Sequence, residues 1–388
     1  MIGNVPHLRF PEFSGEWDSF KLVELGKFIG GGTPSSSNLS FWTGSIPWIS
    51  SSDIKEDNIN NISISRYITE DAIEKSATKY CPAPVILIVS RVGVGKVALS
   101  HTSLCTSQDF CNIIDIKCHP VFLSYNLLRT MKRKSREVQG TSIKGITSDE
   151  LQKIRVFIPK NKDEQNKISN LLTLLDERIV TQNKIIEDLK KLKSAIIEIE
   201  YSPKDSYHSH IGGAIVQISK RNKDNHLCNV LSVSNRQGFI KQSEQFEDRN
   251  VASDDTSNYK IVEKNDFAYN PARINVGSIA RLTKFETGIV SPMYICFRTK
   301  DCLLPEYLEL FFESRNFFYH IQKRLEGSVR LCLSYEELCN IPIVIPSIEK
   351  QKQVDLHLSK LAQKIDLEMK ILQFVQQQKT YLLHQMFI

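Results

Sequence analysis

The chain has 388 residues, which is long enough for two or more domains with sizeable buried cores. Its 41% apolar and 24% charged residues are ordinary for a soluble globular protein, and no run reaches the roughly 18 apolar residues of a membrane span. The net charge of +6 is a mild signal for a polyanionic partner, which many proteins without nucleic-acid partners share.

The nine cysteines are odd in number and include no pair with Cys-x-x-Cys spacing. They indicate reduced, mostly buried thiols of a cytosolic protein. The nearest approach to a metal cluster is His101, Cys105 and Cys111, which lacks the second close-spaced pair of a zinc site, so we expect no metal. Residues 1–17 lack the apolar core of a secretion signal, which also favours a cytoplasmic location.

In chain order, polar loops first alternate with short apolar runs. Residues 30–37 (GGGTPSSS) and 50–53 (SSSD) are expected to be loops, with a strand at 46–49 between them. Continuous β-branched content predicts a buried strand at 85–89, and a tight turn at 91–96 leads into a strand at 97–100. A strand at 110–116 and a helix at 122–134 follow, and this helix ends in the basic residues Lys132, Arg133, Lys134 and Arg136.

A long helical pattern then begins, and it occurs twice, at residues 150–199 and from 337 to the last residue. Each copy opens with a short apolar run that ends in Ile-Pro, at Ile158-Pro159 and at Ile345-Pro346. The core positions of the first helix step by four and three, and adding 186 to each gives the core positions of the second. A repeat kept for four heptads predicts a coiled coil.

Two core positions are polar in both copies, at Gln182 and Lys193 in the first and Glu368 and Lys379 in the second. In an antiparallel pair, the numbers of facing residues have a constant sum. Gln182 opposite Lys379 and Lys193 opposite Glu368 satisfy this condition, so we expect these pairs to fix the register of the helices.

The globular segments also repeat, although they have diverged more than the helices. Residues 273–280 correspond to 91–98, Ser291 to Ser107, and residues 307–312 to 122–127. The predicted organisation is a globular domain at 1–160, a helix at 161–202, a second globular domain at 203–346 and a second helix at 347–388. Two globular domains that have diverged while their helices stayed similar are typical of a protein that binds two different targets.

No catalytic constellation is found in the sequence. The run at 91–96 is not a phosphate loop, because Ser90 and Val97 occupy positions where that motif needs Gly and Ser or Thr. The run at 270–273 (NPAR) lacks the second proline and the aromatic residue of an amino-methyltransferase site. Helicase, metal-nuclease, GxSxG and HExxH patterns are also missing, which favours a binding or scaffolding role.

The best candidates for contacts to DNA lie in loops rich in Ser, Thr, Asn and Arg, because these side chains match phosphates and base edges. An ordinary loop contains the same residue types, and for the glycine-rich turn a plain hairpin is an equal alternative. The predicted DNA-binding residues are Thr33, Ser35, Ser51, Arg91, Lys96, Asn235, Arg236, Arg273, Asn275 and Arg281.

Taken together, the sequence resembles the specificity (S) subunit of type I restriction–modification enzymes over nearly its whole length. The matching motifs, in order, are residues 5–10 (VPHLRF) with Trp17, 31–34 (GGTP), 46–49 (IPWI), 91–93 (RVG), 140–151 (GTSIKGITSDEL), Ile158-Pro159 with Gln165, and Ile345-Pro346 with Gln351. The second domain lacks clear counterparts of the GGTP and IPW motifs.

The resemblance implies an α/β chain with two target-recognition domains separated by two long antiparallel coiled-coil helices. Each domain would contact one half of a bipartite site in double-stranded DNA, and the helices would dock two methyltransferase (M) subunits, with restriction (R) subunits possible. The chain itself would be non-catalytic and without cofactor. S-adenosylmethionine, and ATP with Mg²⁺, would belong to the partner subunits.

Two other functions stay open at this point. The chain could be a DNA-modifying enzyme with an unrecognised active site, or a coiled-coil scaffold that binds protein rather than DNA. If it is a recognition subunit, a helix at 165–197 is about 50 Å long and could set two half-sites one to two turns of DNA apart.

Overall fold

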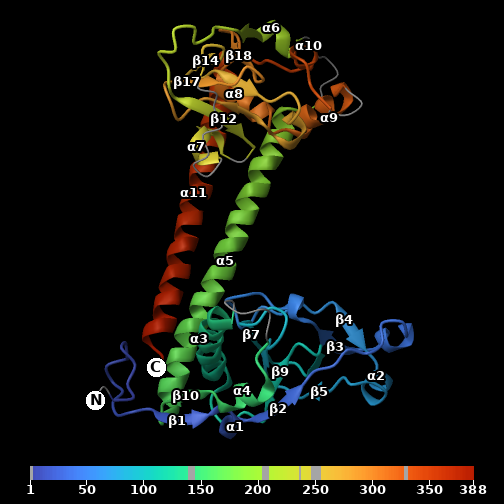
Figure 1. Ribbon diagram of the computed structural model, residues 1–388, viewed down its shortest axis with the longest axis vertical. Helices are drawn as coiled ribbons and strands as arrows, with labels where there is room; N and C mark the ends of the chain where they lie inside the picture. Colours follow the sequence, from blue (N-terminus) through green and yellow to red (C-terminus); the bar gives the residue numbers. More distant parts are fainter. Residues whose placement is uncertain (1–2, 139–144, 203–208, 236, 246–254, 327–330) are drawn as a thin grey trace. The chain divides into compact units, whose positions relative to one another are not determined.

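The computed structural model describes residues 3–138, 145–202, 209–235, 237–245, 255–326 and 331–388 (Figure 1). The chain forms two compact units. Unit 1 consists of residues 1–183 and 370–388, and unit 2 of residues 184–369. Both units combine sheets with helices, so the chain has two α/β domains and two long helices, as predicted.

Unit 1 contains two four-stranded sheets and a two-stranded one. The first, antiparallel throughout, runs in the order β2 (Lys27–Gly30), β9 (Cys111–Ile114), β6 (Val85–Ile88), β7 (Val97–Ser100). The second runs β4 (Arg66–Ile68), β3 (Ile46–Ile49), β8 (Leu104–Thr106), β5 (Tyr80–Cys81), and its β3 and β8 are parallel. The two-stranded sheet pairs β1 (Asp18–Lys21) with β10 (Arg155–Ile158). Every residue of β6 and β7 is buried, which confirms the strands expected from their apolar sequences.

The long helix α3 (Pro120–Val138) contacts β6 and β7. Its Phe122 meets Trp17 and Phe387, with ring centroids 5.7 and 5.0 Å away, so both ends of the chain contribute to the core of unit 1. The shorter helices of this unit are α1 (Leu22–Leu25), η1 (Leu39–Trp42), η2 (Ser51–Asp53), α2 (Glu70–Glu74) and α4 (Ser148–Lys153).

Unit 2 also contains two four-stranded sheets. One runs β11 (Ile215–Ile218), β18 (Ile295–Thr299), β15 (Phe267–Tyr269), β16 (Ile279–Arg281), and the other β13 (Gly238–Lys241), β12 (Val230–Ser234), β17 (Thr287–Val290), β14 (Lys260–Glu263). The helices are α6 (Ile211–Ala214), α7 (Gln242–Gln245), η3 (Ile274–Val276), α8 (Pro305–Phe311), α9 (Arg315–Arg324) and α10 (Tyr335–Cys339). Phenylalanines from β15, β18 and the α8–α9 segment pack against one another in its core.

The strand pairings of the four-stranded sheets match one for one between the two units. In each unit a central strand pairs antiparallel with the next strand along the chain and parallel with a later one: β3 with β4 and β8, and β12 with β13 and β17. The counterpart of residues 46–49 in unit 2 is therefore residues 230–234, although the IPWI sequence is lost there. The duplication inferred from the sequence extends to the sheets.

The two long helices are α5 (Lys162–Glu200) and α11 (Ile348–Gln385), and each contributes residues to both units (Figure 1). In α5 the predicted core positions are buried or half-buried. Within unit 1, residues 168 and 172 of α5 share a core with residues 383 and 386 of α11, while residue 176 contacts residue 379. Numbers rise along one helix as they fall along the other, so the pair is antiparallel.

A glutamine at the start of each helix explains the repeated Ile-Pro-to-Gln spacing. Gln165 Nε2 donates to the carbonyl of Pro159, and its Oε1 accepts from the amide of His119. Gln351 does the same with Pro346 and Leu304. Both side chains are buried, so each one joins a helix start to the globular part of its own unit.

Candidate nucleic-acid interface

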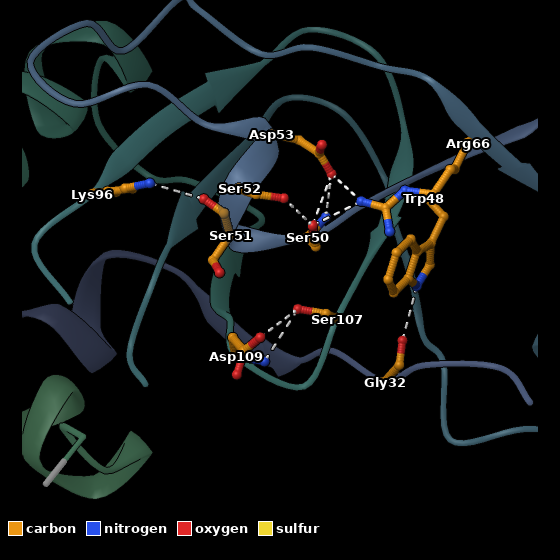
Figure 2. A network of polar contacts seen from close by, with 10 residues as sticks. All are labelled: Gly32, Trp48, Ser50, Ser51, Ser52, Asp53, Arg66, Lys96, Ser107 and Asp109. Carbon is orange, nitrogen blue, oxygen red and sulfur yellow. Dashed lines mark hydrogen bonds and ion pairs between the residues drawn. The ribbon is translucent and has the colours of Figure 1, made fainter. Parts of the chain in front are cut away.

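Two loops of unit 1 meet at one edge of its sheets. The first, the β3 loop, is residues 50–53, directly after β3, and the second, the β6–β7 loop, is residues 89–96. Lys96 Nζ donates to the carbonyl of Ser51 at 3.1 Å and thereby joins them (Figure 2). Gly93 and Gly95 have φ of 86° and 111°, a backbone conformation that L side chains rarely adopt, so glycine is required for this turn.

The β3 loop is held by a cluster of polar and aromatic contacts (Figure 2). Asp53 Oδ2 accepts from the amide of Ser50 at 2.7 Å and forms an ion pair with Arg66 of β4. The Arg66 guanidinium lies 4.5 Å from the centre of the Trp48 ring, and Trp48 Nε1 donates to the carbonyl of Gly32 at 2.9 Å. Since Trp48 is buried while Arg66 is 39% exposed, the cluster extends from the core to the surface.

The GGTP motif lies beside the β3 loop, since Gly32 accepts a hydrogen bond from Trp48. Its backbone also approaches other segments of unit 1 closely. A Cβ on Gly31 would lie 2.0 Å from the carbonyl oxygen of Ser107, and one on Gly32 would lie 2.4 Å from the backbone of Ala77. The exposed Thr33 that follows donates from its hydroxyl to Gln108 Oε1. The motif is therefore a close-packed backbone that ends in an exposed polar loop.

Unit 2 repeats this arrangement with different residues. Asn235 and Gln237 follow β12, and residues 270–278 connect β15 and β16. Ser278, which aligns with Lys96, donates from Oγ to the carbonyl of Val233 at 3.1 Å, so it also joins a turn to the end of a central strand. Gly277 (φ 88°) borders Asn235. The same pair of loops thus occurs in both units.

The predicted arginines of these turns are free to bind a ligand. Arg91 and Arg273 occupy equivalent positions, both are exposed, and neither has a side-chain partner among the described residues. A pocket of about 640 Å³ in unit 1 is lined by Arg91 and Gln108, and one of about 440 Å³ in unit 2 by Asn235 and Gly277.

The other predicted DNA-binding residues fall into three groups. Thr33, Ser35, Asn235 and Asn275 are exposed on the loops, and Ser51 is half-exposed. Lys96 and Arg281 already have partners: Arg281 is 12% exposed and is bound by Glu306, Glu309 and Asn265, so its donors are used inside unit 2. Burial raises the pKa of Glu309, although Arg281 opposes this shift. Arg236 lies outside the described residues.

Comparison with known proteins finds relatives of one kind. The family model of the "Type I restriction modification DNA specificity domain" matches residues 14–191. The MjaIX specificity subunit of Methanocaldococcus jannaschii is 32% identical over 214 residues, or 52% of this chain and 46% of that protein. The EcoR124I/EcoR124II specificity subunit of Escherichia coli is 34% identical over 192 residues, or 47% and 46%. Residues 14–191 thus match the DNA specificity domain of type I restriction enzymes, and about half of the chain is similar to specificity subunits of such enzymes.

In these matches the chain spans about half the length of the curated relatives. Solved structures extend the likeness of the fold to nearly the whole chain. The type I S subunit of Mycoplasma genitalium superposes with a TM-score of 0.59 at 17% identity, covering 99% of both chains. A chain from a study of "complex assembly and conformational transition of the type I R-M system" gives 0.58 at 13% identity, covering 95% of both.

The sequence did not point to Arg66 or Gln108, although both contact predicted residues or motifs. Arg66 lies opposite Trp48 in the pairing of β3 with β4. Gln108 reaches Thr33 across 75 positions of sequence. A Trp-Arg pair on adjacent strands is a usable signal only when the strand pairing is known.

The four polar core residues of the helices have partners of several kinds. Lys379 contacts Asp176 and the carbonyl of Asp57, and Lys193 hydrogen-bonds both carboxylate oxygens of Glu313. Glu368 forms an ion pair with Lys364, one turn earlier on its own helix. Gln182 and Glu368 are buried. The pairing of Gln182 with Lys379 and of Lys193 with Glu368 stays a prediction.

Among the described residues, no group of three His, Cys, Asp or Glu side chains could hold a metal ion. All nine cysteines are free, and burial raises the pKa of Cys105 to about 12, which keeps that thiol protonated at neutral pH. In the described part of the chain, no helix is both long and apolar enough to span a bilayer.

Proposed function

We propose that this chain is the DNA-recognition subunit of a type I restriction–modification enzyme, and that each unit contacts one half of a bipartite site in double-stranded DNA. The observation that carries the proposal is the matched pair of loops in the two units, with Arg91 and Arg273 exposed at equivalent positions and without a side-chain partner among the described residues. Arginine can donate two hydrogen bonds to guanine in the major groove or bind phosphate. The divergent residues around it would give the two half-sites different sequences.

The same proposal covers the partners. The chain is non-catalytic, and two methyltransferase subunits dock on α5 and α11, with restriction subunits joining them. S-adenosylmethionine, and ATP with Mg²⁺, are bound by those partners in the cytoplasm. The specificity-subunit names of the relatives and the repeated helices support this assembly.

Mapping of methylated adenines tests the proposal. The full-length chain is expressed with its methyltransferase partner, and the modified sequence is determined for the wild type, Arg91→Ala and Arg273→Ala. We expect Arg91→Ala to weaken or relax the first half-site only, and Arg273→Ala the second only, by about 1–3 kcal/mol at one position. Arg155→Ala, which removes an exposed arginine outside the loops, should leave the site unchanged.

Two outcomes would contradict the proposal. Methyl transfer from S-adenosylmethionine to DNA by the purified chain alone would show an enzyme. Absence of sequence-selective DNA binding, with and without the methyltransferase, would instead favour a protein-binding scaffold.

A further inference from the structure

Helix α3 of unit 1 has a strongly basic face. Residues 129, 132, 133 and 136 are spaced as i, i+3, i+4 and i+7, which places them on one side of the helix. The residues of this basic face are Arg129, Lys132, Arg133 and Arg136. Arg133 and Arg136 are exposed, and within the described part of the chain neither has an ion pair or a side-chain hydrogen bond. The face therefore carries positive charge that the protein does not neutralise.

The charges of this face lie close enough to affect one another. The pKa of Arg129 is lowered by burial and then by the charge of Arg133. The pKa of His384 on α11 is lowered by burial and then by Arg129, Arg136 and Lys132. Basic residues can also serve to stabilise the carboxyl end of a helix through its dipole, but this effect is confined to the last turn. Arg129 and Lys132 lie before the last turn of α3, so the helix dipole does not explain their presence.

The carboxyl half of α3, which carries the basic face, lies next to both loops of the candidate interface in unit 1. Lys132 forms an ion pair with Asp57, four residues after the β3 loop. A Cβ on Gly95 would lie 3.1 Å from the side chain of Ser135, so the end of α3 packs against the β6–β7 loop. A duplex held by these loops would bring its backbone next to the helix.

We propose that the basic face of α3 binds backbone phosphates of DNA beside the half-site that unit 1 contacts. This inference rests on the proposed function and adds a phosphate-binding surface to it. Phosphate contacts fix the position of a protein on the duplex without selecting its sequence. Arg133 and Arg136, which have no side-chain partner in the described part of the chain, supply the direct contacts. Lys132 exchanges Asp57 for phosphate or stays on the rim.

The counterpart of α3 in unit 2 consists of α8 and α9, and α9 corresponds to the carboxyl half of α3 that carries the basic face. In α9, Lys323 lies 4.3 Å from the centre of the Tyr319 ring, and Arg324 pairs with Glu337. The two basic side chains in the last turn of α9 thus have partners inside unit 2, and Arg315, at the start of α9, is a single exposed arginine rather than part of a basic face. The structure therefore assigns this type of phosphate contact to unit 1.

The test measures how the affinity for DNA depends on salt. The full-length chain, alone and with its methyltransferase partner, is titrated with duplexes that contain or lack the site found by methylation mapping. Each phosphate contact contributes about 0.9 to the slope of log K against log salt, so Arg133→Gln/Arg136→Gln should reduce the slope by about 1.8 on both duplexes. The methylated sequence should stay the same.

Two further variants control for folding and for general loss of charge. Arg133→Lys/Arg136→Lys keeps the charge and should keep the slope. Lys117→Gln/Lys153→Gln removes two exposed lysines of unit 1 outside this face and should also leave the slope unchanged. An unchanged slope in Arg133→Gln/Arg136→Gln, with selective binding intact, would overturn the inference and leave the proposed function standing.

Loss of methyltransferase assembly with an unchanged slope would assign the face to a protein partner and equally overturn the inference. A wild-type chain without selective binding would overturn the proposed function itself.

Discussion

Lys379 of α11 and Asp176 of α5 form an ion pair that is almost fully buried in unit 1, with the two side chains 4% and 3% exposed. Tyr125 of α3 donates to the second Asp176 oxygen at 2.7 Å, and the carbonyl of Asp57 also accepts from Lys379. One buried lysine thus connects both long helices with the segment that follows the β3 loop. Removing it would leave a buried carboxylate without its counter-charge.

Lys379→Met should therefore destabilise unit 1 by about 3–5 kcal/mol, the usual cost of breaking a buried ion pair from one side. Chemical denaturation followed by circular dichroism measures this loss. The double variant Asp176→Asn/Lys379→Met removes both charges and should be more stable than Lys379→Met alone. If both variants lose the same stability, the ion pair is not the cause.

The stability of the single variant Lys379→Met should also depend on pH in a characteristic way. Burial raises the pKa of Asp176 above its ordinary value of 3.8, while Lys379 opposes the shift. Between the ordinary and the raised pKa the folded state binds more protons than the unfolded state, so this group makes stability fall as pH rises. In Lys379→Met the pKa rises further, because the opposing charge is gone. Acidification from pH 7 towards 5 should restore part of its stability, and the double variant should show no such recovery.

A side chain at Gly32 is expected to destabilise unit 1. A Cβ there would lie 2.4 Å from the backbone of Ala77, and the Gly32 carbonyl accepts from both Trp48 Nε1 and Thr78 Oγ1. Gly32→Ala should cost about 1–3 kcal/mol of folding free energy, because backbone must move to accommodate the methyl group. Thermal unfolding measures the change. Gly30→Ala is the matched control, since nothing lies within 4 Å of its Cβ position, and an equal loss in both variants would refute the steric argument.

The sequence predicted the elements whose signals are local. The heptads of α5 and α11 predict long helices because apolar spacing depends on neighbouring residues only, and β6 and β7 follow from continuous apolar runs. The Ile-Pro-to-Gln spacing was visible, but its cause, two buried glutamines that bind backbone groups of the globular parts, needed the tertiary structure.

The residues of the candidate interface could be predicted from the sequence only where strand pairing is not needed to find them. The counterpart of β3 in unit 2 was not found in the sequence, because residues 230–234 (VLSVS) share no motif with IPWI, and only the pairing with β13 and β17 identifies them. Arg281 was predicted to contact DNA from its place beside a glycine-rich turn. Its carboxylate partners, Glu306 and Glu309, lie 25 and 28 positions away, where no local pattern reveals them.

Arg66 should control how unit 1 recognises DNA more than how it folds. Its ion pair with Asp53 is 39% exposed on the arginine side, so its loss should cost at most about 1 kcal/mol of stability. Arg66→Ala releases the β3 loop, and we expect about tenfold weaker modification of the first half-site with the second unchanged. Arg66→Lys keeps the charge but not the planar stacking on Trp48. Its modification of the first half-site should therefore lie between that of the wild type and that of Arg66→Ala. Equal weakening of both half-sites in the methylation map would contradict this role.

The length of the helix pair should set the number of unspecified base pairs between the half-sites. A seven-residue insertion keeps the phase of the core, so one heptad placed after Asn183 and one after Met369 should lengthen both helices without exposing their apolar positions. Seven residues add about 10.5 Å of helix, and 10 base pairs span about 34 Å, so the spacer should grow by at most about three base pairs. Four-residue insertions at the same sites shift the core phase and should lower stability instead. Methylation mapping of the heptad variant measures the spacer, and an unchanged spacer in a folded, active complex would show that helix length does not determine it.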